Sequence, residues 1–148
     1  MAEQSDILIS AFQEHCTQLR HHETQRSNMT SIIVVVAAGV LAFIANNGVT
    51  KDKWPLALFL IFIGIFGALF SAKQYEMLRW NKTIAKKYKE ELEMLSKLGL
   101  SAIRANADAE HRKRFPILKK LRLFYFWIVL HSLIAGLGLF LLAYVLRK

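Results

Sequence analysis

Three long runs of apolar residues without a charged side chain constrain the fold of this chain more than any other feature. They cover about residues 30–45, 54–71 and 123–146, and the last contains 24 residues with one histidine, His131, and no charged residue. A helix rises about 1.5 Å per residue, so about 20 apolar residues cross the ~30 Å hydrocarbon core of a bilayer. We therefore predict an all-α integral membrane protein with three transmembrane helices.

The distribution of residue types agrees with this prediction. Hydrophobic residues make up 54% of the chain and charged residues 21%, but the two classes lie in separate blocks. A helix of a soluble protein has one apolar face, whereas a membrane helix is apolar on every side. Cys16 is the only cysteine, which excludes an intramolecular disulfide and a thiolate metal cluster. The first apolar run follows a long polar segment, so we expect no cleavable signal peptide.

Turn signals and charge divide the chain into four segments. Asn47-Gly48 and Pro55 indicate a tight turn, which makes the first two runs an antiparallel transmembrane hairpin with Trp54 as an interfacial anchor. The predicted segments are a cytoplasmic amphipathic helix over 1–28, the hairpin over 29–72, a basic cytoplasmic helical segment over 73–122 and the third transmembrane helix over 123–148.

The N-terminal segment has apolar residues at helical spacing. They recur every three or four residues and therefore share one face of a helix. We expect this face to pack against another helix of the same protein, with a position in the membrane interface as the alternative. The residues of the face are Leu8, Ala11, Phe12, His15 and Leu19.

The charge of the segment between the second and third runs predicts the topology. Residues 72–122 contain fourteen Lys and Arg against six Asp and Glu, a net +8 of the total +9. Cytoplasmic segments of membrane proteins are enriched in Lys and Arg. We therefore expect a multi-pass protein of the cell inner (plasma) membrane with its N-terminus in the cytoplasm. The 48–53 loop and the C-terminus are then outside.

The first half of the basic segment predicts a stalk that continues the second transmembrane helix. Charge pairs such as Lys86 with Glu90 favour a helix, Gly99 is a natural C-cap, and a shorter helix is expected over 101–114. An apolar stripe along the stalk needs a cover, from the N-terminal helix, from the 101–114 helix or from a second subunit. We expect a homo-oligomer, with a cytoplasmic protein partner as the alternative. The face comprises Trp80, Ile84, Tyr88, Leu92 and Leu95.

Within the apolar runs, small residues and one histidine stand out. Gly64 with Ala68 and Ser132 with Gly136 lie four residues apart, a spacing that lets membrane helices approach closely. His131 is an intramembrane polar residue, and such residues are often functional; the alternative is a neutral ring hydrogen-bonded to a neighbouring helix.

Basic residues beside the third run predict contact with anionic lipid, because such lipids attract juxtamembrane positive charge. Without an aromatic platform or a glycine-rich phosphate loop beside them, these residues do not indicate nucleic acid. The predicted lipid-binding residues are Arg112, Lys113, Arg114, Lys119, Lys120 and Arg122.

Patterns of catalysis and metal binding are weak. His15 and His22 share a helix face but lie too far apart for one tetrahedral metal site. Arg104 and His111 resemble the Arg–six residues–His pattern of HEPN-type ribonucleases, which would imply RNA cleavage by this pair, although Ala105 replaces the polar residue usual after the arginine. We expect a protein that is not an enzyme and binds no metal or cofactor, with a membrane-tethered ribonuclease as a minor alternative.

Residues 10–98 resemble small bacterial membrane proteins of the SLATT type in their layout. The polar segment RHHETQRSN leads into a short apolar run and a tight hairpin, and the stalk KQYEMLRWNKTIAKKYKEEL follows directly. The resemblance implies an oligomeric effector that permeabilises or perturbs the inner membrane in anti-phage defence. A membrane scaffold or regulatory subunit that anchors a cytoplasmic partner is the alternative. The third apolar run departs from the two-span core of that group.

Overall fold

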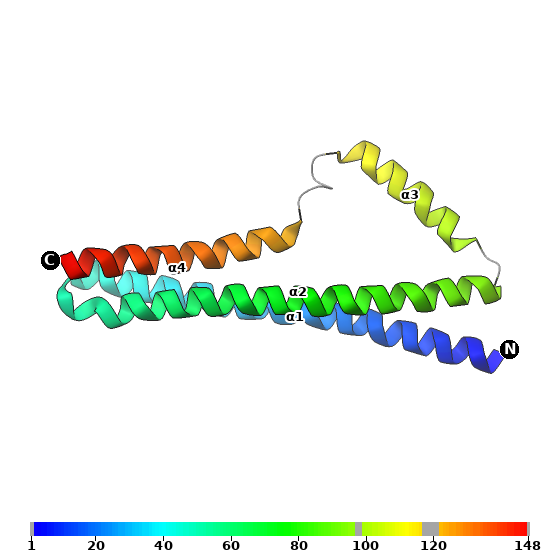
Figure 1. Cartoon of the computed structure of the whole chain (residues 1–148), viewed down its shortest axis with the longest axis horizontal. Helices are drawn as coiled ribbons and strands as arrows, with labels where there is room; N and C mark the ends of the chain where they lie inside the picture. The colour runs from blue at the N-terminus through cyan, green and yellow to red at the C-terminus, as the bar shows by residue number, and fades with distance from the viewer. Residues whose placement is uncertain (1, 97–98, 117–121, 148) are drawn as a thin grey trace. The chain divides into compact units, whose positions relative to one another are not determined.

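The computed structural model describes residues 2–96, 99–116 and 122–147, and within these ranges the chain contains helices and no strands (Figure 1). The long helix α1 is followed by the short 3-10 helix η1, the second long helix α2, the shorter helix α3 and the apolar helix α4. Their bounds are Ala2–Asn47, Lys51–Lys53, Trp54–Ser96, Leu100–Arg114 and Leu123–Arg147.

Helices α1, α2 and α4 are long and apolar enough to cross a membrane. The predicted all-α class and the three long apolar helices are therefore confirmed. Helix α2 combines the second apolar run and the predicted stalk in one element, as expected. The predicted N-terminal helix and the first apolar run also form a single helix, because no glycine or proline precedes Gly39 within α1.

Gly99 lies directly before α3. Helix α2 ends at Ser96, and Gly99 is the residue that precedes α3, with a left-handed φ of 59°. Its carbonyl oxygen accepts a hydrogen bond from the backbone N–H of Ala102 at 3.1 Å. Glycine adopts this backbone conformation without the steric penalty of a Cβ atom. Gly99 is therefore the residue before α3, and its predicted role as the C-cap of the stalk helix stays a prediction, because residues 97 and 98 lie outside the described residues.

The chain divides into two compact units, which we describe separately. The apolar unit consists of residues 24–75 and 123–147 and thus contains parts of α1 and α2 together with α4. Its core is small, and the cluster of buried residues at its centre comprises Ile33, Ala37, Leu60 and Ile134. The polar unit consists of residues 2–23 with the described part of 76–122, and α3 belongs to it.

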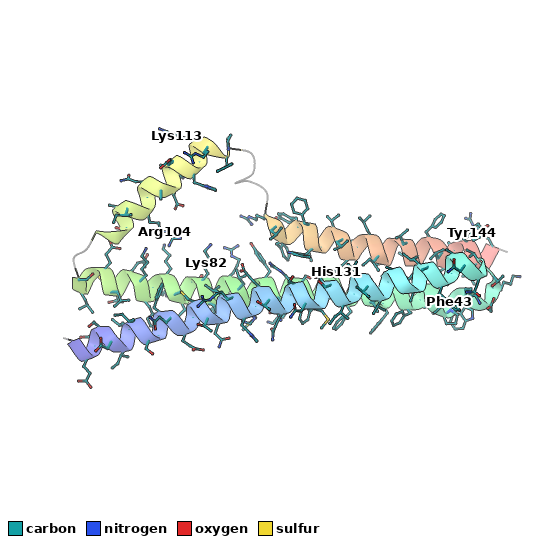
Figure 2. All side chains as sticks on the ribbon, turned by 180° about the vertical axis from the view of Figure 1, so that it is seen from behind. Phe43, Lys82, Arg104, Lys113, His131 and Tyr144 are labelled. Carbon is teal, nitrogen blue, oxygen red and sulfur yellow. The ribbon has the colours of Figure 1, made fainter. Side chains whose placement is uncertain are left out.

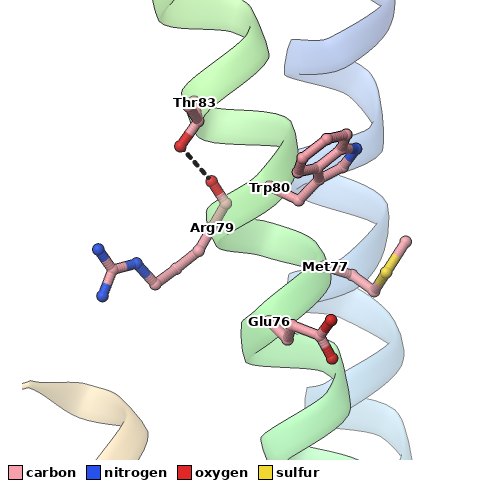
Figure 3. Close-up of a pocket in the computed structure, with 5 residues that line it drawn as sticks. All are labelled: Glu76, Met77, Arg79, Trp80 and Thr83. Atoms are coloured by element: carbon pink, nitrogen blue, oxygen red, sulfur yellow. Dashed lines mark hydrogen bonds between the residues drawn. The ribbon is translucent and has the colours of Figure 1, made fainter.

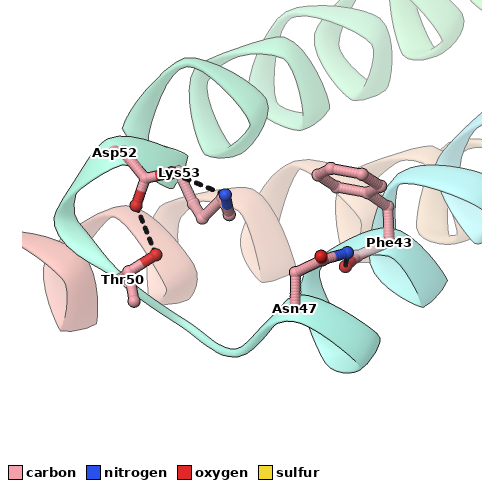
Figure 4. Close-up of polar contacts among 5 residues, drawn as sticks. All are labelled: Phe43, Asn47, Thr50, Asp52 and Lys53. Carbon is pink, nitrogen blue, oxygen red and sulfur yellow. Dashed lines mark hydrogen bonds and ion pairs between the residues drawn. The ribbon is translucent and has the colours of Figure 1, made fainter.

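A tight turn joins α1 and α2 within the apolar unit (Figure 4). Gly48 has a φ of 76°, and Asn47 Nδ2 donates a hydrogen bond to the carbonyl oxygen of Phe43 at 2.9 Å. The carboxylate of Asp52 accepts hydrogen bonds from the Thr50 hydroxyl and from Lys53. The turn predicted from Asn47-Gly48 is confirmed, and the side chains of Asn47, Thr50, Asp52 and Lys53 are hydrogen-bonded within it.

Candidate functional site

Most of the surface of the apolar unit consists of apolar side chains. In the most apolar stretch of α1, α2 and α4, 22%, 28% and 28% of the residues are buried. Large apolar side chains on this surface include Val35, Phe62 and Phe140, which are 70%, 68% and 68% exposed. Phe43 and Tyr144, both labelled in Figure 2, are also exposed. The unit therefore presents apolar surface on the outer sides of its three helices.

The interior of this unit contains a polar cluster in two layers. In the first layer Thr30 Oγ1 lies 3.3 Å from His131 Nε2, and both residues are buried. Gly67 of α2 also belongs to this layer, because it lies directly against the His131 ring. A Cβ atom added at this position would be 2.6 Å from His131 Cε1. His131 is labelled in Figure 2. Of the two readings of His131, the hydrogen bond to a neighbouring helix is thus the one seen.

The second layer lies one helical turn away on each of the three helices. It consists of Arg26, Ser71 and Trp127, and the Arg26 guanidinium carbon lies 5.7 Å from the centre of the Trp127 ring. One turn further, Tyr75 of α2 stacks on Phe124 of α4 with ring centres 4.2 Å apart, which fixes the register of these helices. The second layer therefore lies between the His131 layer and the polar ends of the apolar runs.

Both layers contain polar atoms without a hydrogen-bond partner among the described residues. These atoms are fully buried, and there are two obligate donors, a hydroxyl group and one imidazole nitrogen. Buried polar groups in folded proteins are nearly always hydrogen-bonded, so such a group calls for an explanation. The atoms are Arg26 Nε, Trp127 Nε1, Ser71 Oγ and His131 Nδ1.

The two predicted pairs of small residues have different environments. Gly64 is buried against α4, where an added Cβ atom would lie 2.8 Å from the carbonyl oxygen of His131, and Ala68 is partly buried. Ser132 and Gly136 are exposed, and an added Cβ atom at Gly136 would meet nothing within 4 Å. The first pair therefore lies at a helix contact within the chain, and the second lies on the outer surface of α4.

The predicted stalk face is divided in the polar unit. The ring of Tyr88 stacks on His15 of α1 with centres 5.6 Å apart, and His15 Nδ1 lies 2.8 Å from Asn81 Oδ1. Ile84 and Leu92 are partly buried, whereas Trp80 and Leu95 are 62% and 45% exposed. The N-terminal helix, one of the three covers considered, thus covers part of the stripe and leaves Trp80 open.

A shallow pocket lies beside Trp80 on α2 (Figure 3). Its volume is about 440 Å³. The hydroxyl of Thr83 at its edge donates a hydrogen bond to the carbonyl oxygen of Arg79 at 2.9 Å. The pocket combines an aromatic ring, a thioether and one charge of each sign, and it is lined by Glu76, Met77, Arg79, Trp80 and Thr83.

Helix α3 covers no part of the stripe in the structure, since every side chain described between 101 and 116 is exposed. Arg104 and His111 of the ribonuclease-like pattern lie on this helix, and His111 contacts the ring of Phe115. In the basic cluster, Arg112, Lys113, Arg114 and Arg122 are exposed, whereas Lys119 and Lys120 lie outside the described residues. Among the described residues, no three of His, Cys, Asp and Glu gather around a common point that could hold a metal ion.

Sequence reasoning did not single out Arg26, Ser71, Trp127 or Asn81 as site residues. Arg26 and Trp127 lie at the ends of apolar runs, where arginine and tryptophan are common. Only the packing of α1, α2 and α4 shows that Arg26, Ser71 and Trp127 share a layer. No family model matches the chain, and no curated protein or solved structure is significantly similar to it.

Proposed function

We propose that this chain is a multi-pass protein of the inner (plasma) membrane that forms homo-oligomers and permeabilises or perturbs the bilayer. The observation that carries the proposal is the apolar outer surface of the three long helices, of whose most apolar stretches only 22% to 28% of residues are buried. Monomeric soluble proteins rarely expose apolar patches larger than a few hundred Å². A lipid environment accounts for this surface.

The charge distribution supports one orientation in the membrane. The net +8 of residues 72–122 favours the cytoplasm for this segment, and the N-terminal part of α1 is then cytoplasmic as well. The turn around Asp52 and the C-terminal end of α4 face the outside. Exposed Arg112, Lys113 and Arg114 on α3 are available to anionic lipids of the inner leaflet.

The surface of α4 supports self-association. Ser132 and Gly136 form a small, exposed strip on which a second helix can approach closely, and small residues of this kind are common at helix contacts in membranes. The similarity in layout to SLATT-type effectors is what suggests permeabilisation and a role in anti-phage defence. Because the three runs are almost wholly apolar, a pore would be gated by dewetting or would form only on activation.

The proposal is tested with the purified full chain in nanodiscs and in liposomes loaded with a fluorescent dye. We expect a particle mass of several copies and dye release on activation. Gly136→Leu should block close helix approach, reduce the mass to that of a monomer and abolish release. Leu139→Ile, on the exposed surface of the same helix, is the control. A monomeric wild-type particle, or liposomes that stay intact with every trigger tried, would refute the proposal.

A membrane scaffold is the second candidate, and the pocket beside Trp80 favours it. The Trp80 indole is 62% exposed and lies in a pocket with Glu76 and Arg79, which makes it a surface for docking of a cytoplasmic protein. Recovery of one stoichiometric soluble partner, lost with Trp80→Ser but kept with Met94→Ser, would support this candidate. Met94 is 65% exposed on the same helix but lies outside the pocket.

A tethered ribonuclease is the third candidate, on the sequence pattern alone. RNA cleavage or toxicity that persists in the Arg104→Ala and His111→Ala variants would exclude it.

A further inference from the structure

The surroundings of the buried His131 side chain fit a neutral ring. The residue is 1% exposed, Nε2 lies 3.3 Å from Thr30 Oγ1, and Nδ1 has no hydrogen-bond partner among the described residues. A neutral imidazole has one N–H donor and one acceptor nitrogen, whereas the protonated ring has two donors. The Thr30 hydroxyl can serve only one of them. Protonation would therefore place a charge in the interior and leave a buried N–H without an acceptor.

The new charge would have no counter-ion in the apolar unit. Residues 24–75 and 123–148 contain a single acidic residue, Asp52. Its carboxylate is bound to Thr50 and Lys53 in the turn between α1 and α2. Gly67, which lies against Nδ1 of the His131 ring, is about 20 Å from the start of α2 by helix rise. At this distance Asp52 cannot form an ion pair with the ring.

The other charged group next to the ring is positive. Arg26 lies one turn before Thr30 on α1, and residues 27–47 of that helix contain no charged side chain. Arg26 is 6% exposed, so a protonated His131 would share the interior with a second cation, about 5 Å away along the helix axis. Outside the turn, the remaining titratable residues of the segments 24–75 and 123–147 are Lys73, Tyr75, Tyr125, Tyr144 and Arg147.

We propose that uptake of a proton by His131 releases α4 from its contact with α1 and α2. The packed arrangement holds the neutral ring, whereas an arrangement with the ring in water holds the proton without these costs. Acid therefore shifts the equilibrium toward the released form, in the range of about pH 5 to 8 where histidine ordinarily titrates.

This inference rests on the proposed function, for which it names the trigger. A charged imidazole inside a bilayer needs water around it. Release of α4 would bring that water between helices that are otherwise almost wholly apolar, which is the wetting step that a closed apolar pore requires.

The test is cysteine labelling of the full chain in detergent, in a Cys16→Ser background that has no other cysteine. Ile134→Cys places a thiol on the face of α4 that packs in the core cluster, at a position that is 8% exposed. Leu133→Cys, next to it and 61% exposed, is the reference. The ratio of the two labelling rates with N-ethylmaleimide cancels the effect of pH on the thiol itself. We expect this ratio to rise about tenfold from about pH 8 to about pH 5, the effect of one unit of difference in proton affinity.

Two variants assign the effect to the imidazole. His131→Gln keeps an amide beside Thr30 but takes up no proton, so its ratio should not change with pH. Arg26→Gln retains the histidine and removes the like charge, so its ratio should rise less than that of the wild type; this variant decides if His131→Gln does not fold by circular dichroism. His21→Gln, an exposed histidine of α1, should behave as the wild type.

A wild-type ratio that is independent of pH would overturn the inference, as would an equal rise in folded His131→Gln. Dye release from liposomes at the same pH values is measured separately. A rise in labelling that requires His131, without dye release, would support the release of α4 and refute the proposed permeabilisation.

Discussion

At the scale of single residues, the closest helix approach in the apolar unit depends on glycine. The imidazole of His131 occupies the space that a side chain at position 67 would need, and this ring is itself 1% exposed. Interiors of proteins are close-packed, so a buried ring cannot move aside without displacing its neighbours. Gly67 therefore leaves the room that the His131 ring needs, while Gly64 and Gly138, where an added Cβ atom would meet backbone atoms of the facing helix, allow the close approach of α2 and α4.

We predict that Gly67→Ala destabilises the protein by about 1–3 kcal/mol, the usual effect of overpacking a core. Gly39→Ala is the matched control, since an added Cβ atom there meets nothing within 4 Å. It should leave the unfolding temperature in detergent unchanged or raise it slightly, because alanine favours helix more than glycine does. Equal unfolding temperatures for the two variants would contradict the packing that we describe.

The sequence allowed only part of this site to be predicted. His131 stands out because it is the single histidine within the three apolar runs, and Gly64 because it belongs to a small-residue pair. Arg26 has no such signal, since arginines at the end of an apolar run usually face water or lipid headgroups. Its burial follows from the register of α1 with α4, which local patterns do not contain.

At the scale of elements, the junction between α2 and α3 contains a specific hydrogen bond. Glu93 Oε1 accepts a hydrogen bond from the backbone N–H of Ser101 at 2.8 Å. Hydrogen bonds from Ser101 hold the pKa of the Glu93 carboxyl below its ordinary value of 4.5. The carboxylate thus satisfies one of the backbone donors that every helix start leaves unpaired.

We predict that this contact depends on pH in one direction. A carboxyl group whose pKa is lowered in the folded state stabilises that state above its ordinary pKa, and the contribution disappears as the pH falls through the folded pKa. The hydrogen-exchange protection of the Ser101 amide should therefore be constant near neutrality and decrease below the ordinary range of glutamate. Glu93→Ala should lose this protection at neutral pH, whereas Glu91→Ala, an exposed neighbour, should retain it. Protection unaffected by acid would contradict the assignment.

The extent of the helices was easier to predict than their partners. Apolar runs and i,i+4 charge pairs are local, and the Lys86–Glu90 pair is indeed present at 3.3 Å. The stripe on α2 was predicted as one face, but Tyr88 stacks on His15 and Trp80 is open. Which residues of a stripe are covered depends on where the second helix lies. A stripe that is covered along its whole length and one that is covered only in part have the same residue spacing, so the sequence does not distinguish them.

At the scale of the whole molecule, the proposed topology leads to a labelling experiment. In a Cys16→Ser background the chain has no other cysteine, so single cysteines can be introduced without interference. Thr50→Cys should react with an impermeant maleimide on intact spheroplasts, whereas Ser101→Cys should react only after permeabilisation. The reason is the positive charge of residues 72–122, which favours the cytoplasmic side. The reverse pattern would invert the proposed orientation, and labelling of both positions in intact cells would refute a spanning hairpin.

The contact between the His131 ring and Gly67 also has an evolutionary consequence. Glycine is needed at position 67 only while an imidazole fills the adjacent space, so the order of substitutions matters. A lineage that replaces the glycine first passes through a destabilised intermediate, whereas one that loses the histidine first becomes free to change both. Among diverging descendants of this sequence, the two positions should therefore covary, while the uncrowded Gly39 drifts independently of either.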